Sequence, residues 1–61
     1  MCQATVFLDD SQIMEEVVTI NPTDDGLVLK SLFNETKTVK AKIREIDLLT
    51  HKVYLVGEKN G

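Results

Sequence analysis

The sequence of 61 residues contains no tryptophan, one proline, one histidine and one cysteine, Cys2. A single cysteine cannot form a disulfide within the chain, so the disulfide framework of many small secreted domains is excluded. A chain of this length hides only about 60% of the surface that its unfolded form exposes, and its core is marginal. We therefore expect one domain over residues 1–61, supported by a metal ion or by a second chain.

Long hydrophobic runs and a secretory leader are also missing. The apolar run at residues 4–8 is too short for the core of a signal peptide, and no basic segment precedes it. No run of about 18 apolar residues is present that could form a membrane-spanning helix. These absences predict a cytoplasmic protein without a membrane partner.

Basic residues are absent from residues 1–26, which contain six acidic residues, whereas residues 27–61 contain all seven basic residues and four acidic ones. The net charge of −3 disfavours non-specific binding to nucleic acid, because such binding requires lysine and arginine to neutralise phosphates. The segregated charges favour solvated strand faces that pair across a sheet. A dipolar surface that orients a partner is the alternative.

Residue types that carry catalysis are scarce. Serine occurs twice, the three glycines are too scattered for a phosphate-binding loop, and His51 lies in a polar segment. Carboxylates that are neighbours in sequence, such as Asp9 and Asp10, point to opposite faces of a strand and do not form acid–base pairs. We expect no enzymatic activity. The remaining catalytic hypothesis is a Cys2 nucleophile with His51 as its base.

Seven valines, four isoleucines and six threonines against two alanines favour strands over helices. Asn21-Pro22 is expected to end a strand, and the Asp-Gly pair at residues 25–26 predicts a tight hairpin. Residues 44–49 fit either a short helical turn or a bent strand, and we favour the strand. The expected strands are residues 4–9, 12–21, 27–33, 37–43 with the bent continuation 44–49, and 53–56.

Short strands at this spacing, separated by turn residues, indicate a small sandwich or barrel. We predict an all-β fold, a small SH3-like barrel of five to six short antiparallel strands, with an OB-like barrel as the alternative. Tyr54 is expected to pack or to contact a partner rather than to act as an acid.

Cys2 is the candidate metal ligand. If the initiator methionine is removed, the α-amine and the thiol of Cys2 can close a five-membered chelate ring, and both have reference pKa values of about 8 to 8.5. A deprotonated amide nitrogen of Gln3 would make the ligand set planar and tridentate. A thiolate with nitrogen donors in a square plane suits Ni(II) or Cu(II). The alternatives are a Cys2 that packs as a small apolar residue and a His51 that serves as an accessory ligand or is simply a solvated turn residue.

Several segments together carry a family resemblance: the Met1-Cys2 start, residues 4–8, the hairpin at 20–29, residues 31–35, the Ile-Arg-Glu-Ile-Asp-Leu-Leu stretch at 43–49, and residues 51–55. On these segments the chain resembles the CooT family, small nickel-binding accessory proteins of carbon monoxide dehydrogenase maturation. The resemblance implies an SH3-like barrel that forms a homodimer. It also implies one Ni(II) held through the N-terminal Cys2 of each chain, and delivery of nickel to carbon monoxide dehydrogenase.

Two chains would supply two Cys2 thiolates and two nitrogens, which complete a square plane. The alternative function is an SH3-like RNA-binding or protein-interaction adaptor without metal, because many relatives are labelled predicted RNA-binding proteins. An adaptor would use the basic residues Lys30, Lys40, Lys42 and Arg44. Binding of single-stranded nucleic acid is disfavoured by the acidic balance and by the presence of only three aromatic residues.

Overall fold

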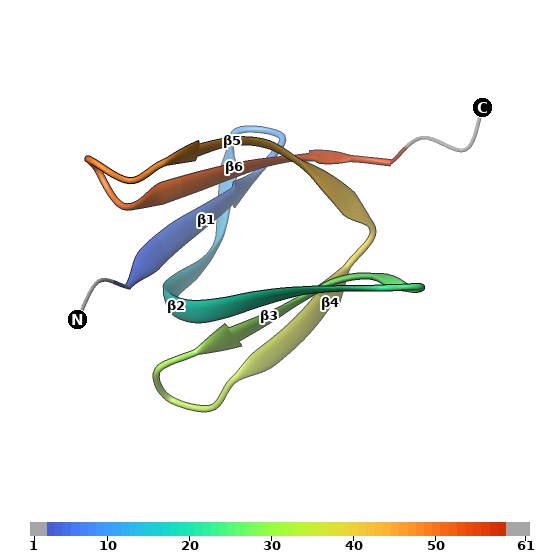
Figure 1. The fold of residues 1–61 in the computed structure, drawn as a ribbon, viewed down its shortest axis with the longest axis horizontal. Helices are drawn as coiled ribbons and strands as arrows, with labels where there is room; N and C mark the ends of the chain where they lie inside the picture. The colour runs from blue at the N-terminus through green and yellow to red at the C-terminus, as the bar shows by residue number, and fades with distance from the viewer. Residues whose placement is uncertain (1–2, 59–61) are drawn as a thin grey trace.

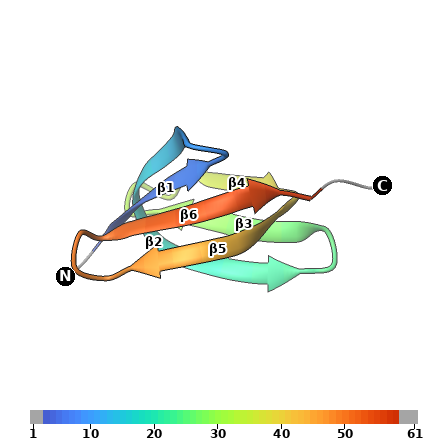
Figure 2. The same cartoon turned by 90° about the horizontal axis from the view of Figure 1, so that it is seen from above.

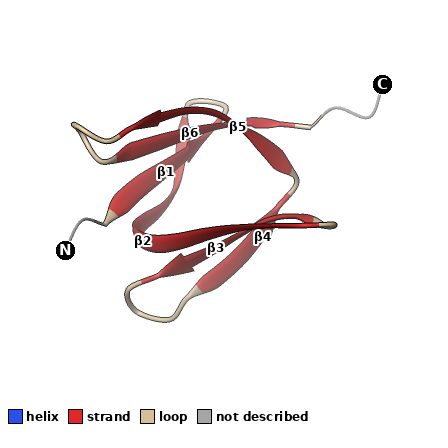
Figure 3. Ribbon diagram, viewed as in Figure 1, coloured by secondary structure: helices blue, strands red, loops and turns tan. Residues whose placement is uncertain are grey.

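The computed structural model describes residues 3–58, which form six β-strands and no helix. The strands are β1 (Ala4–Leu8), β2 (Ser11–Thr23), β3 (Gly26–Ser31), β4 (Thr36–Val39), β5 (Ala41–Asp47) and β6 (Lys52–Gly57). Figure 1 traces them in chain order, and Figure 3 shows that short turns connect them. The predicted all-β class is confirmed. No helix among these residues is long and apolar enough to cross a membrane.

All six strands belong to one sheet in the order β4-β3-β2-β1-β6-β5. The pairings are antiparallel except that of β1 with β6, which run parallel from Thr5↔Lys52 to Leu8↔Leu55. The prediction that the strands pair antiparallel is therefore wrong for β1 and β6. The reason is that hairpin turns fix the direction of neighbouring strands only, and β1 and β6 come from opposite ends of the sequence.

The sheet curls so that β5 contacts β3, but it does not close, and β4 and β5 remain its edge strands (Figure 2). Lys40 alone separates β4 from β5. Because a hairpin needs at least two connecting residues, these two edges cannot fold back and pair with each other. The architecture is an open, curled sheet that is compatible with a small SH3-like fold.

The strand β2 bends to serve both halves of the sheet. Its first part pairs with β1, from Ser11 to Val17, and its second part pairs with β3, from Val17 to Thr23. Register shifts flank Val17 on both sides, and Glu16 has a φ of 57°. The extra residues at such bulges increase the local bend of a strand.

Within residues 3–58, the core consists of seven buried apolar residues from the inner face of the curled sheet. They are Val6, Val17, Leu27, Leu29, Ala41, Val53 and Leu55. The alternation predicted for residues 4–9 is confirmed, since Val6 is fully buried and its neighbours on the same face, Ala4 and Leu8, pack against the core.

The hairpin predicted at residues 23–26 is confirmed, but β2 does not end at Asn21. It continues through Pro22, which pairs with Leu27, to Thr23, which pairs with Gly26. Hydrogen-bonded and non-hydrogen-bonded pairs alternate in an antiparallel ladder. Because Thr23 and Gly26 flank the turn as a hydrogen-bonded pair, the nitrogen of Pro22 points away from β3 and the strand needs no N–H there.

The predicted bent strand is also confirmed in part. β5 continues from Ala41 to Asp47, with a register shift against β6 between Ile43 and Glu45, and residues 48–51 then form a turn. The segment 27–33 is shorter than predicted, because β3 ends at Ser31 and residues 32–34 form a turn.

Candidate functional site

The start of β1 is held between two other parts of the chain. On one side Ala4 pairs with Val17 of β2. On the other side the backbone N–H of Thr5 donates to the carbonyl of His51 at 2.9 Å, which ties β1 to the β5–β6 turn. Cys2, the predicted nickel ligand, lies outside the described residues. It comes two positions before Ala4, the first residue of β1, in the sequence.

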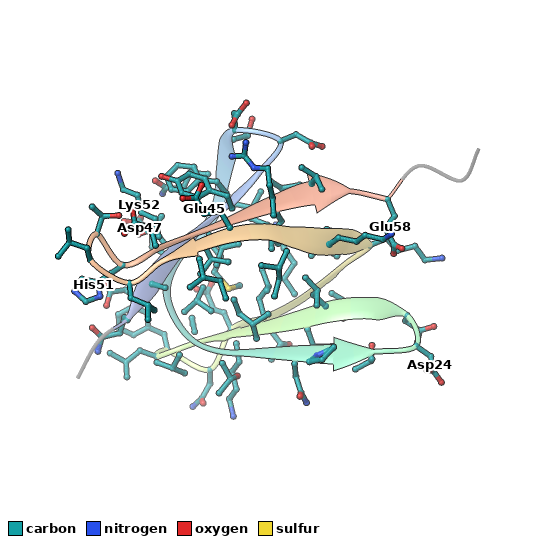
Figure 4. All side chains as sticks on the ribbon, turned by 45° about the horizontal axis from the view of Figure 1, so that its top comes forward. Asp24, Glu45, Asp47, His51, Lys52 and Glu58 are labelled. Atoms are coloured by element: carbon teal, nitrogen blue, oxygen red, sulfur yellow. The ribbon has the colours of Figure 1, made fainter. Side chains whose placement is uncertain are left out.

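His51 occupies the β5–β6 turn with an exposed side chain and a φ of 58°. Figure 4 shows it at the end of the molecule where β1 begins. The prediction of a solvated turn residue is confirmed. Its role as an accessory metal ligand stays a prediction.

The β5–β6 turn is organised by the carboxylate of Asp47. Its Oδ1 accepts hydrogen bonds from the backbone N–H of Thr50 at 3.1 Å and of Leu49 at 3.0 Å. These bonds, first of all the backbone bond from Thr50, hold the pKa of Asp47 below its ordinary value of 3.8. An aspartate that caps its own turn in this way fixes the turn's backbone. Leu48 and Leu49 are therefore presented on an ordered turn.

These leucines continue a band of apolar side chains along the edge strand β5. Leu48 is 78% exposed and Leu49 is 90% exposed, and Ile43 and Ile46 are about half exposed. Ile43 and Ile46 pair with the buried Leu55 and Val53, so they line the inner face of the sheet at its open edge. We call Ile43, Ile46, Leu48 and Leu49 the β5 strip.

Apolar residues gathered at one edge of a small domain form a candidate surface for contact with another molecule. The sequence analysis missed the two leucines as exposed residues, because it assigned residues 44–49 to a strand. An aspartate followed three residues later by threonine is a turn signal that could have located them.

The outer face of the sheet carries an aromatic pair. The rings of Phe7 on β1 and Tyr54 on β6 stack with centroids 5.4 Å apart and planes 21° apart, so Tyr54 packs as predicted. The guanidinium of Arg44 lies 5.4 Å from the Tyr54 ring centre, and the ammonium of Lys52 lies 6.0 Å from that of Phe7. Nη2 of Arg44 also lies 3.8 Å from Oδ1 of Asp10. Arg44 therefore makes contacts within the chain. It is one of the four basic residues that an RNA-binding adaptor would use.

The acidic pair Asp9 and Asp10 lies in the turn between β1 and β2. Both residues have positive φ in the β1–β2 turn, and Oδ1 of Asp9 accepts a hydrogen bond from Gly57 at 3.2 Å. Within residues 3–58, no group of three histidine, aspartate or glutamate residues is arranged to hold a metal ion. The metal hypothesis therefore depends on Cys2 and on backbone nitrogens near it.

Comparisons with known proteins identify a matching family and a similar solved structure. The family model described as CO dehydrogenase accessory protein CooT matches residues 1–56. The crystal structure of a protein assigned as CooT from Carboxydothermus hydrogenoformans is 32% identical and superposes with a TM-score of 0.90, covering 95% of this chain and 100% of that one.

Two uncharacterized archaeal proteins are also similar. The one from Methanocaldococcus jannaschii is 26% identical over 57 residues, which span 93% of this chain and all of that protein. The one from Methanothermobacter thermautotrophicus is 27% identical over 59 residues, which span 95% and 92% of the two chains.

The fold is a small, open β-sheet compatible with an SH3-like fold, with exposed apolar residues along one edge. The chain belongs to the CooT family of CO dehydrogenase accessory proteins, as the match over residues 1–56 shows. The resemblance found in the sequence is thereby confirmed. The family is one of accessory proteins rather than catalysts, which supports a role in the maturation of CO dehydrogenase.

Proposed function

We propose that this protein binds Ni(II) as cargo and delivers or stores it for CO dehydrogenase maturation, with the ion held by Cys2 of each chain at a homodimer interface. Family membership supports the accessory role. The observation that carries the proposal is the position of the start of β1, where the N–H of Thr5 ties the strand to the turn bearing Leu48 and Leu49. A second copy that covers these leucines would lie next to the segment that contains Cys2.

The donor set fits nickel. Removal of Met1 would free the α-amine of Cys2 beside its thiol, so a backbone nitrogen of Cys2 or Gln3 can serve as the second donor of each chain. Thiolate and nitrogen donors favour Ni(II) in a square plane, whereas Mg(II) and Ca(II) prefer oxygen. One chain has a single thiolate, so a second chain completes the plane with a second sulfur and nitrogen.

The β5 strip supports the homodimer. Full burial of a leucine or isoleucine side chain is worth roughly 1.5–3 kcal/mol, so covering Leu48 and Leu49 of both chains is a substantial favourable term for association. A metal ion that binds only the dimer stabilises it further by mass action. Both contributions would stabilise a domain with a small core, in which seven apolar residues among residues 3–58 are buried.

Nickel titration of the wild type and of Cys2→Ala tests the proposal. Intact mass spectrometry first establishes whether Met1 has been removed from each preparation. We expect the wild type without Met1 to develop a thiolate-to-nickel absorption band that saturates at one ion per two chains, and Cys2→Ala to develop none. His51→Ala is the matched control and should keep the band, because the imidazole is an accessory ligand at most. Equal nickel binding by Cys2→Ala would refute the assignment.

A further inference from the structure

A groove of about 490 Å³ lies between the first part of β2 and the β3–β4 turn, remote in sequence from the β5 strip. Its apolar lining is provided by Ile13, Met14 and Phe33. Its charged lining consists of three glutamates and one lysine, namely Glu15, Glu16, Glu35 and Lys37. The groove thus combines an apolar lining with an excess of negative charge.

One wall of this groove is a free strand edge. β2 pairs with β1 over Ser11 to Met14, whereas its pairing with β3 starts only at Val17. Within residues 3–58, no strand pairs with the opposite edge of residues 11–15. A free edge offers backbone donors and acceptors on which an extended peptide can add as a further strand.

The other wall is the β3–β4 turn, which Ser31 holds in a fixed shape. Ser31 is 1% exposed, and its Oγ accepts hydrogen bonds from the backbone N–H of Phe33 at 3.1 Å and of Glu35 at 3.2 Å. Its own backbone N–H donates to the carbonyl of Glu35 at 2.9 Å, and its carbonyl accepts from Asn34 at 3.1 Å.

This turn presents Phe33 with 70% of its surface exposed. Phe33 lies in the turn and is absent from the core. An aromatic side chain on an ordered turn loses little conformational entropy when a partner covers it, and such residues carry much of the binding energy in interfaces.

We propose that this groove binds an extended, basic segment of a partner protein. The segment adds along the free edge of β2 at residues 13–15. One of its apolar side chains packs on Phe33 and Met14, and its lysine or arginine side chains lie beside Glu16 and Glu35.

Charge complementarity favours a basic segment, rather than a second copy of the chain, as the molecule that binds in the groove. The glutamates attract a basic segment, whereas a second copy carries a net charge of −3 and the same three glutamates. The inference uses neither Cys2 nor the β5 strip, so it stands independently of the nickel proposal.

A short blocked peptide that alternates lysine and valine is the probe, and a peptide that alternates glutamate and valine is its matched control. Fluorescence anisotropy with the full chain at low salt measures affinity, and amide chemical shifts locate the site. We expect the lysine peptide alone to bind, with shifts concentrated at residues 12–16 and 33–37. Phe33→Ala should weaken binding about fivefold or more, and the double variant Glu16→Gln/Glu35→Gln by a similar factor.

Two control variants match these changes elsewhere on the molecule. Leu49→Ala removes an apolar side chain that is even more exposed than Phe33, and Asp24→Asn/Asp25→Asn removes two carboxylates from the β2–β3 turn; both should leave peptide affinity unchanged. Equal weakening by the Asp24/Asp25 variant would overturn the proposal, since binding would then follow net charge. The proposal also fails if Phe33→Ala alters sedimentation of the protein but not peptide affinity, because a second copy would then occupy the groove. Circular dichroism verifies that each variant is folded.

Discussion

The N–H of Thr5 donates to the carbonyl of His51 across 2.9 Å, so the beginning of the first strand and the turn before the last strand form one structural unit. This unit ties the start of β1 to the turn that also contains Leu48 and Leu49. If Cys2 binds Ni(II) at a homodimer interface as proposed, a change in the β5 strip is expected to affect nickel binding through dimer formation.

Leu49→Lys tests the contact surface directly. The side chain is 90% exposed, so its replacement should leave the free energy of unfolding of the single chain almost unchanged. If the β5 strip forms the dimer, a lysine there raises the dimer dissociation constant at least about tenfold, because its charge would be buried against apolar surface. Sedimentation velocity with and without Ni(II) measures this effect.

Asp24→Lys is the matched control for this charge change, since Asp24 lies in the exposed β2–β3 turn. We expect it to leave the sedimentation profile of the wild type unaltered. If Leu49→Lys also leaves the sedimentation profile unchanged, the β5 strip is not part of the dimer interface. The nickel titration of Cys2→Ala remains a separate test of metal binding.

Ser31→Ala tests the anchor of the β3–β4 turn. The change removes the buried hydroxyl that accepts hydrogen bonds from the backbone N–H groups of Phe33 and Glu35. Loss of these bonds should lower the free energy of unfolding by about 1–3 kcal/mol in urea denaturation. Ser11→Ala, at an exposed position, serves as the control and should change it by less than about 0.5 kcal/mol. Equal midpoints for the two variants would show that the Ser31 hydroxyl does not hold the turn.

Asp47 should make stability depend on pH. Its pKa is lower in the folded chain than its ordinary value of 3.8, so its ionised form favours folding. The stabilisation is fully present above that ordinary value and is lost as the pH falls through the lowered pKa. Asp47→Asn keeps an acceptor oxygen but cannot titrate, so its urea midpoint should fall less steeply in acid than that of the wild type. If the urea midpoints of the two proteins fell equally steeply below pH 3.8, this account of Asp47 would be contradicted.

Gly26 and Gly57 form a matched pair for backbone tests. Gly26 has a φ of +131°, and a Cβ there would meet the carbonyl of Val39, whereas a Cβ at Gly57 would meet only the side chain of Asp9 at 3.2 Å. We expect Gly26→Ala to lower the free energy of unfolding by more than about 3 kcal/mol. This is a large share of the roughly 3–9 kcal/mol expected for a domain of this length.

Gly57→Ala should cost less than about 1 kcal/mol, because the Asp9 side chain can move aside. Urea denaturation of both variants gives the comparison. Similar losses at the two positions would mean that the close approach of Val39 to Gly26 does not limit this hairpin.

Local patterns in the sequence predicted much of the fold. The alternation around Val6 and the turn before Gly26 both follow from neighbouring residues, and the structure has both. The parallel pairing of Thr5 with Lys52 could not be predicted in this way, because it joins residues far apart in sequence and depends on the curl of the whole sheet. The continuation of β2 through Pro22 depends on which edge its nitrogen faces, and this is set by the pairing register.

The candidate site was predictable to a smaller extent. Cys2 stood out by residue type and position, and the family match supports the resemblance that suggested its role. The sequence analysis assigned Leu49 and Phe33 to strands, because apolar character alone does not distinguish a buried residue from one held in solvent. Their exposure follows from the hydrogen bonds of Asp47 and Ser31, which fix the turns that present them.

The parallel ladder between β1 and β6 has a consequence for synthesis on the ribosome. β1 cannot gain this partner until residues 52–57 have emerged, so β2 is available to β1 before β6 is. Until then the segment before Ala4 is attached to a strand that lacks one of its two neighbours. A peptidase that trims the first residue would thus meet its substrate before the final strand docks.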